Sequence, residues 1–228
     1  MINVEKVYVL HYTKLTERRE RLEEELSKYN IKAVWITEFD QEDLTDDMIS
    51  NTYDKNKESY DAKIHPVYGN RSTPHRLLNM AEISCTFKHR EAIKLIAQEC
   101  NDYGLILEDD VLLCNDFDKY FNMFIENTPE DWDAIFMGSC ANLHVPANLL
   151  THGKTAYRIA DPASRGGDSY LLKKTLAEKI TASMNTFVTI SDWELSYQLW
   201  LHQSKTYWWE PSLVAQGSEC GLYKSTLR

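Results

Sequence analysis

The stretch Gly104-Leu105-Ile106-Leu107-Glu108-Asp109-Asp110 does most to decide the fold of this chain. Its first four residues are an uncharged, mainly apolar run that predicts a buried central strand. Three carboxylates follow at once, where the strand leaves the core. Ligands of open α/β sheets bind beyond the carboxyl ends of the strands. The stretch therefore predicts a ligand site at the end of this strand.

The three adjacent carboxylates repel one another unless solvent or a cation offsets their charge. Carboxylate oxygens suit Mn²⁺ or Mg²⁺, which commonly join one or two acidic side chains to substrate phosphates. We therefore expect a divalent metal at Asp110 and Glu108, with Asp110 as the principal ligand. In an alternative interpretation, Asp109 and Asp110 only cap the turn that follows the strand.

The segments before this strand predict a parallel sheet. A strand over residues 4–10, a helix over 16–29 and a strand over 33–36 form a β-α-β unit. The helix has one apolar face, made by Leu15, Leu22, Leu26 and Tyr29. Residues 40–75 are polar, and we expect a short acidic helix and then a long loop that serves as an insert or lid. Helical spacing resumes over 78–100.

Strands and helices keep alternating after Glu108-Asp109-Asp110, the acidic stretch. We expect a helix over 117–125, a strand over 134–137, a loop over 142–155, a strand over 169–172 and a helix over 173–184. The last helix begins with a capping box, Ser191-x-x-Glu194, and its expected buried stripe is Trp193, Tyr197, Trp200 and Leu201. This order predicts one α/β domain over residues 1–228 with a mostly parallel central sheet.

Composition narrows the possible functions. Of the 228 residues, 43% are hydrophobic and 26% charged, as in ordinary globular proteins. The net charge of −10 argues against a nucleic-acid partner. An acidic protein that handles a phosphorylated substrate needs a cation as mediator. This expectation agrees with a metal at the acidic stretch.

Location is predicted from three further features of the sequence. The first six residues lack the pattern of a secretion signal, and no apolar run approaches the roughly 20 residues of a transmembrane helix. The five cysteines form no C-x-x-C pair, and their odd number argues against a closed disulfide framework. We expect a cytoplasmic protein without a transmembrane segment, with peripheral contact at the inner face of a membrane as a further option.

Several segments, in order, resemble glycosyltransferase family 25, which contains bacterial lipopolysaccharide galactosyltransferases and collagen galactosyltransferases. Glu82-Ile83-Ser84-Cys85-Thr86-Phe87-Lys88-His89 is similar to the Glu-x-Gly-Cys-x-x-Ser-His helix of the family, and residues 105–111 resemble its metal motif. Weaker similarities are Asp168-Ser169-Tyr170-Leu171-Leu172, Asp192-Trp193 and Pro211-Ser212-Leu213-Val214-Ala215-Gln216. The chain departs from the family pattern at Val9, Ser84 and Lys88.

The resemblance implies a Rossmann-like fold of the GT-A type and a nucleotide-sugar donor whose anomeric centre is inverted. The implied donor is a hexose nucleotide, with UDP-galactose as the first candidate, and the implied acceptor is a hydroxyl of a glycan or glycolipid. It also implies that Asp109, His89, His11 and Arg18 contact the nucleotide sugar. Arg18 has the alternative of a solvated helix face, and His89 that of a hydrogen-bonded packing residue.

Inverting transfer needs one general base that takes the proton of the acceptor hydroxyl. Asp192 is the expected base, and Asp168 is the reserve candidate. Asp192 has a purely structural alternative, because an acidic residue in the first turn of a helix is favoured by the helix dipole.

Two other classes of function stay open at this point. A phosphatase-like hydrolase also places acids at a strand end, but it needs a nucleophilic Asp two residues before a second Asp, and Glu108 stands there instead. A non-catalytic sugar-binding module would tolerate the loss of Asp110. Trp208-Trp209-Glu210 could supply a stacking wall for a sugar, or these rings could pack in the core.

Overall fold

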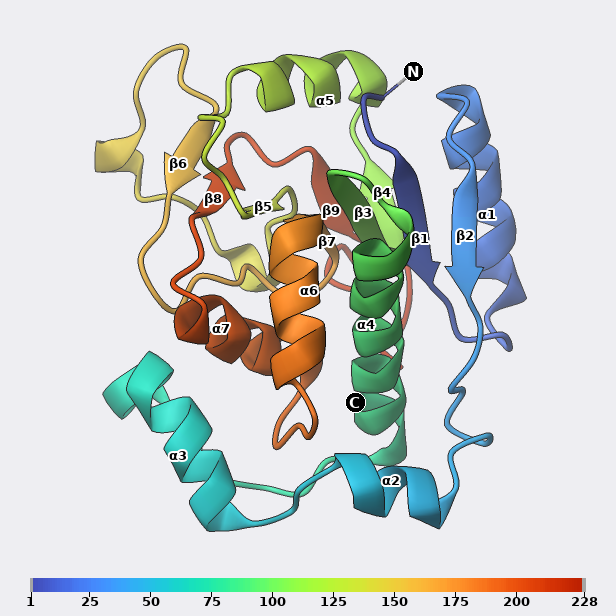
Figure 1. The fold of residues 1–228 in the computed structure, drawn as a ribbon. Helices are drawn as coiled ribbons and strands as arrows, with labels where there is room; N and C mark the ends of the chain where they lie inside the picture. Colours follow the sequence, from blue (N-terminus) through green and yellow to red (C-terminus); the bar gives the residue numbers. More distant parts are fainter. Residues whose placement is uncertain (1, 227–228) are drawn as a thin grey trace.

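The computed structural model describes residues 2–226 and is built around a seven-stranded sheet (Figure 1). The strand order is β2-β1-β3-β7-β5-β8-β6. The strands are β1 Lys6–Leu10, β2 Ala33–Ile36, β3 Tyr103–Glu108, β5 Ala134–Phe136, β6 Ala156–Arg158, β7 Ser169–Lys173 and β8 Thr206–Trp209. β1 is parallel to β2 and β3, and β5 is parallel to β8, whereas β7 and β6 are antiparallel to their neighbours. Five of the seven strands thus share one direction, which confirms the predicted α/β fold with a mostly parallel sheet.

Helices cover both faces of the sheet (Figure 1). Helices α4, α6 and α7 pack on one face around Tyr8, Ile106 and Tyr170, whereas α1 and α5 pack on the other around Leu105 and Trp209. Strands covered on both faces must be apolar on both, which explains the uninterrupted run in β3. The helices are α1 Thr16–Lys28, α4 Met80–Glu99, α5 Phe117–Glu126, α6 Lys174–Ser183 and α7 Ser191–Leu201.

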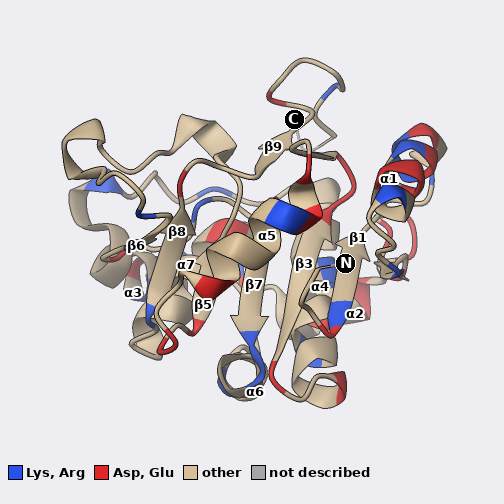
Figure 2. Ribbon diagram, turned by 90° about the horizontal axis from the view of Figure 1, so that it is seen from above, with Lys and Arg blue, Asp and Glu red and all other residues tan. Residues whose placement is uncertain are grey.

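Local sequence explains where α4 begins and which face of α1 is buried. Asn79 caps α4, and its side chain and that of Glu82 bond each other's backbone N–H groups in a capping box. Acidic and basic residues are mixed along α1 (Figure 2), and Leu22 and Leu26 lie on its buried face. Within residues 2–226, none of the helices is both long enough and apolar enough to cross a membrane.

The long loop predicted within residues 40–75 is wrong, because much of this segment is helical. It contains α2 Asp46–Thr52, α3 Lys57–Tyr68 and a short 3₁₀ helix, η1 Gly69–Arg71. Tyr60, Ile64 and Val67 recur at helical spacing and are buried in α3, the first two beside Val188. Pro66 obscured this pattern in the sequence; it lies in the last turn of α3, where its missing N–H group removes one backbone hydrogen bond near the helix end.

The predicted details of α7 are also wrong. Ile190 is the N-cap residue, and no side chain caps this helix. Glu194 is completely buried, where it accepts hydrogen bonds from Lys63 Nζ and from the Val188 N–H, both at 3.0 Å. The buried apolar residues are Leu195 and Leu199, not the predicted stripe, whose members Trp193, Tyr197 and Trp200 are half-buried and whose Leu201 is exposed.

A second, two-stranded sheet was not predicted, and it joins the acidic stretch to the C-terminal part of the chain. β4 Val111–Leu113 pairs antiparallel with β9 Val214–Gln216. Strands of three residues are too short to show a periodic pattern. The predicted loop over 142–155 includes a 3₁₀ turn, η3 Ala147–Leu149, and another, η2 Cys140–Asn142, ends at its first residue.

Candidate functional site

A pocket opens at the carboxyl ends of β1 and β3, where the sequence predicts the ligand site. The space within it, counting the open solvent at its mouth, is about 730 Å³. Its wall is formed by four parts of the chain: the β1–α1 junction, α4, the acidic stretch and the segment after β9. Lining residues include His11, Arg18, Lys88, Asp109, Asp110 and Gln216.

Asp109 joins two other predicted nucleotide-sugar ligands. One of its oxygens lies 2.8 Å from His11 Nδ1, and the other accepts a hydrogen bond of 3.0 Å from Arg18 Nη1. All three side chains are almost completely buried. The Arg18 guanidinium also donates to the Lys224 carbonyl and lies 4.9 Å from the centre of the Tyr223 ring. The structure therefore brings together the end of β1, α1 and the acidic stretch, and it does not place Arg18 on a solvated face.

Asp110 has a buried oxygen that no hydrogen bond satisfies among the described residues. One oxygen accepts a hydrogen bond of 3.2 Å from the Ser218 N–H, and the other is buried without a hydrogen-bond partner in the described part of the chain. Burial, reinforced by the negative charge of Glu108, raises the pKa of Asp110 to about 6. A buried carboxylate oxygen without a partner is costly, and a cation would satisfy it. The residues present therefore fit a divalent metal.

Gly217 allows the chain after β9 to reach Asp110. Its N–H donates to the Asp110 carbonyl at 2.8 Å, and a Cβ atom at position 217 would lie only 2.7 Å from that carbonyl oxygen. A larger residue there would push the C-terminal segment away from the pocket. The close approach thus depends on glycine.

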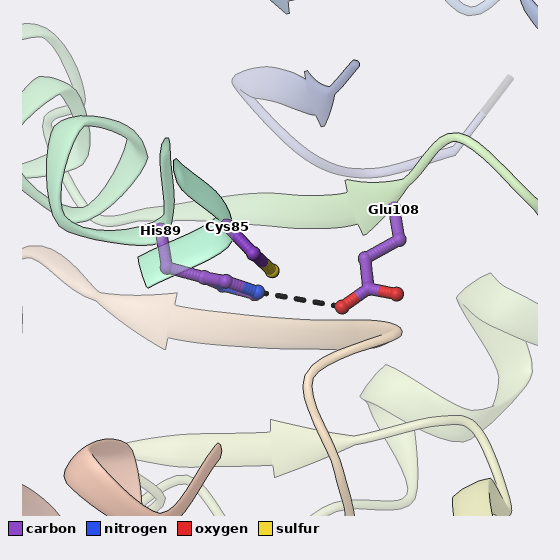
Figure 3. Close-up of side chains that lie close together, drawn as sticks. All are labelled: Cys85, His89 and Glu108. Carbon is purple, nitrogen blue, oxygen red and sulfur yellow. Dashed lines mark hydrogen bonds and ion pairs between the residues drawn. The ribbon is translucent and has the colours of Figure 1, made fainter. Parts of the chain in front are cut away.

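Glu108 faces α4 (Figure 3). One of its oxygens lies 3.4 Å from His89 Nε2, and the other accepts a hydrogen bond of 3.1 Å from Gln216 Nε2. His89 Nδ1 lies 3.0 Å from the hydroxyl of Tyr170, which is completely buried. The predicted ligands Glu108 and His89 are therefore neighbours, and His89 is both packed and turned toward the acidic stretch.

Residues 4–161 match the sequence model of glycosyltransferase family 25, described as an LPS biosynthesis protein family. The chain belongs to glycosyltransferase family 25. This family 25 enzyme is therefore a glycosyltransferase, and neither a phosphatase-like hydrolase nor a non-catalytic sugar-binding module describes it.

Two other comparisons add no functional argument for this family 25 enzyme. A search of curated proteins finds no match. A solved structure described as "Crystal Structure of A197 from STIV" is 15% identical, with a TM-score of 0.41 over 90% of this chain and 81% of that chain. A similarity at this level carries no inference about activity.

The two candidate bases lie beyond the matched residues, and the structure gives them different surroundings. Asp192 lies in the first turn of α7 and is half-buried. Burial raises its pKa to about 6; the backbone N–H groups of the helix start oppose this shift, and the charge of Glu108 adds to it. Asp168 is only 1% exposed, and burial raises its pKa well above the ordinary value. An acceptor hydroxyl therefore reaches Asp192 more readily than Asp168.

Of the two roles considered for Trp208 and Trp209, a stacking wall for a sugar or core packing, the structure shows core packing. Trp209 is fully buried between Phe121 and Phe124, and Trp208 donates its indole N–H to the Ala163 carbonyl. Both rings belong to the core.

Sequence analysis did not assign a role to Lys88, which lines the pocket. Lys88 Nζ donates to Asp40 Oδ1 at 2.7 Å and to the Glu38 carbonyl at 2.6 Å, and Ser84 donates to the Phe39 carbonyl. Burial raises the pKa of Asp40, but the hydrogen bonds from Lys88 and Thr13 outweigh this effect, and the net pKa is lowered. Both departures from the family pattern on α4 thus attach the segment after β2 to that helix.

The raised pKa of Asp110 predicts how stability depends on pH. The folded protein holds this proton up to about pH 6, whereas an unfolded aspartate releases it near pH 4. Asp110→Asn should therefore raise the free energy of unfolding of the metal-free protein. The gain should grow between pH 4 and pH 6 to about 3 kcal/mol and stay at that value at higher pH. Urea unfolding at several pH values measures the gain. A gain that does not change with pH, or one that the exposed control Asp47→Asn also shows, would contradict this explanation.

Proposed function

We propose that this family 25 enzyme transfers a hexose from a nucleotide sugar to a hydroxyl of a glycan or glycolipid, with inversion at the anomeric carbon. The observation that carries the proposal is a buried oxygen of Asp110 that has no hydrogen-bond partner within residues 2–226, on the wall of a pocket that also contains Arg18 and His11. A diphosphate needs positive charge, and the acidic stretch alone cannot supply it. UDP-galactose is the first donor to test, because the family resemblance suggests it.

Asp110, with Glu108 beside it, would hold a Mn²⁺ or Mg²⁺ ion. Such an ion supplies positive charge that stabilises the departing diphosphate. Arg18 adds a fixed positive charge on the same wall, at 3.9 Å from Asp110. Because Asp109 and the Lys224 carbonyl hold its guanidinium, Arg18 needs little rearrangement as charge develops.

Asp192 is the proposed general base. Its raised pKa places it between an ordinary carboxylate and a neutral-pH base, so it is ionised at pH 7 and still able to accept a proton. The start of α7 lies beside the helix that faces Glu108, because the Ser191 hydroxyl is 3.8 Å from the Cys85 sulfur. Asp168 stays a structural residue in this proposal, because its carboxylate is enclosed.

A glycolipid acceptor would bring the enzyme to a membrane surface. Peripheral contact is part of this proposal and depends on the acceptor. A water-soluble glycan acceptor would remove the need for it.

The first test is a panel of nucleotide sugars assayed for transfer and nucleotide release, with Mn²⁺ or with chelator. We expect one hexose nucleotide to be used, with activity lost in chelator and reduced at least about 100-fold by Asp110→Asn. Asp47→Asn, an exposed acidic residue of α2, is the matched control and should keep full activity. Transfer that ignores both chelator and Asp110→Asn would refute the metal-assisted mechanism.

The second test concerns the base. Turnover should fall about tenfold for each pH unit below about 6, because a protonated Asp192 cannot accept the acceptor proton. Asp192→Asn should reduce turnover at least about 100-fold and leave donor binding unchanged. Unchanged turnover, or equal loss of donor binding measured by calorimetry, would assign Asp192 a structural role at the start of α7.

A further inference from the structure

A group of three side chains beside the acidic stretch has the composition of a transition-metal site. Cys85 and His89 lie four residues apart on one face of α4, and Glu108 meets them from the end of β3 (Figure 3). The thiol sulfur, an imidazole nitrogen and a carboxylate oxygen all lie within 4.8 Å of one another. Ligand atoms around a tetrahedral ion are roughly 3.3 to 3.8 Å apart at ordinary zinc bond lengths, so small side-chain adjustments would complete the arrangement.

We propose that Cys85, His89 and Glu108 bind a divalent transition-metal ion of the zinc class. This site is distinct from the Mn²⁺ or Mg²⁺ site proposed at Asp110, and it goes beyond the proposed sugar transfer. The two sites meet only at Glu108. Thiolate and imidazole ligands favour zinc over magnesium, which prefers an all-oxygen shell.

Neighbouring groups already orient the three ligands. Tyr170 contacts His89 Nδ1 at 3.0 Å, which directs the Nε2 atom toward Glu108. Gln216 holds the second oxygen of Glu108, and the Ser191 hydroxyl lies 3.8 Å from the Cys85 sulfur. Supporting contacts of this kind are usual around metal ligands, where they set the ring orientation of the histidine.

The site also has an entrance, and no side chain crowds it at position 167. A Cβ atom at Gly167 would lie 3.0 Å from His89 Nε2 and 3.3 Å from a Glu108 oxygen, so glycine lets the backbone approach both groups without crowding them. Cys85 and Glu108 line the pocket, which gives an ion a path from solvent. Three protein ligands leave a fourth position for water or a substrate oxygen, as in catalytic zinc sites. On binding, the Cys85 thiol would lose its proton to solvent and coordinate as thiolate.

The test uses the full chain after removal of metals by chelation. Titration with Co²⁺ should produce the near-ultraviolet absorption of a cobalt–thiolate bond, and Zn²⁺ should displace it, whereas excess Mg²⁺ should not. Cys85→Ser should abolish the thiolate band, and His89→Ala should weaken Co²⁺ binding by more than about 10-fold. Cys114→Ser is the matched control and should keep the band, because Cys114 is half-buried and its hydrogen bonds with Tyr29 and Leu213 are made by its backbone.

A wild-type protein that shows no cobalt–thiolate band, or a Cys85→Ser variant that keeps it, would overturn the proposal. Far-ultraviolet circular dichroism of each variant confirms folding, and the wild-type titration needs no variant at all. Asp110→Asn should keep the Co²⁺ band while it loses sugar transfer. This variant separates a failure of the zinc site from a failure of the proposed transferase mechanism.

Discussion

The mutual repulsion of Glu108, Asp109 and Asp110 is the constraint on which the site depends. Adjacent carboxylates at a strand end, shielded from water, destabilise the fold unless each has its own compensation. Asp109 pairs with the Arg18 guanidinium and lies 2.8 Å from His11 Nδ1, both from the start of the chain. Glu108 is held by His89 from α4 and by Gln216 from β9. Within residues 2–226, Asp110 accepts one hydrogen bond, from the Ser218 N–H, and has Arg18 at 3.9 Å, while its other oxygen has no hydrogen-bond partner and is left for a ligand.

This division of roles explains why segments far apart in the sequence converge on one pocket. Each carboxylate is contacted by a different segment. The β1–α1 junction contacts Asp109, the middle of α4 contacts Glu108, and the chain after β9 contacts Asp110. Gly217 allows the last of these segments to contact the Asp110 backbone. The site is therefore positioned by the sheet and also by the hydrogen bonds and ion pairs that offset the charges of the three carboxylates.

Sequence patterns predicted the parts of the fold that repeat over short distances. The apolar run of β3 and the spacing of Ile93 and Ile96 in α4 were sufficient, because covered strands and helices need continuous or periodic apolar residues. The same reasoning missed α3, where Pro66 concealed a valid period. It also misplaced the buried face of α7, because Glu194 is buried through a pairing with Lys63, which lies 131 residues away in the sequence.

The candidate site was predicted in part for the same reason. The acidic stretch is local, so its position at a strand end could be inferred, and the family resemblance added His11, Arg18 and His89. The pairing of Arg18 with Asp109 spans 91 residues, and no periodic pattern reports it. Lys88 and Asp40 were missed because a buried ion pair is formed by the tertiary fold.

The central claim is that Asp110 is the carboxylate reserved for a cation at the donor diphosphate. Electron paramagnetic resonance of Mn²⁺, titrated with the protein in the presence of a nucleoside diphosphate, tests it directly. The signal of free Mn²⁺ should fall as wild-type protein is added and should stay unchanged with Asp110→Asn. Equal loss of the free signal with both proteins would contradict this assignment.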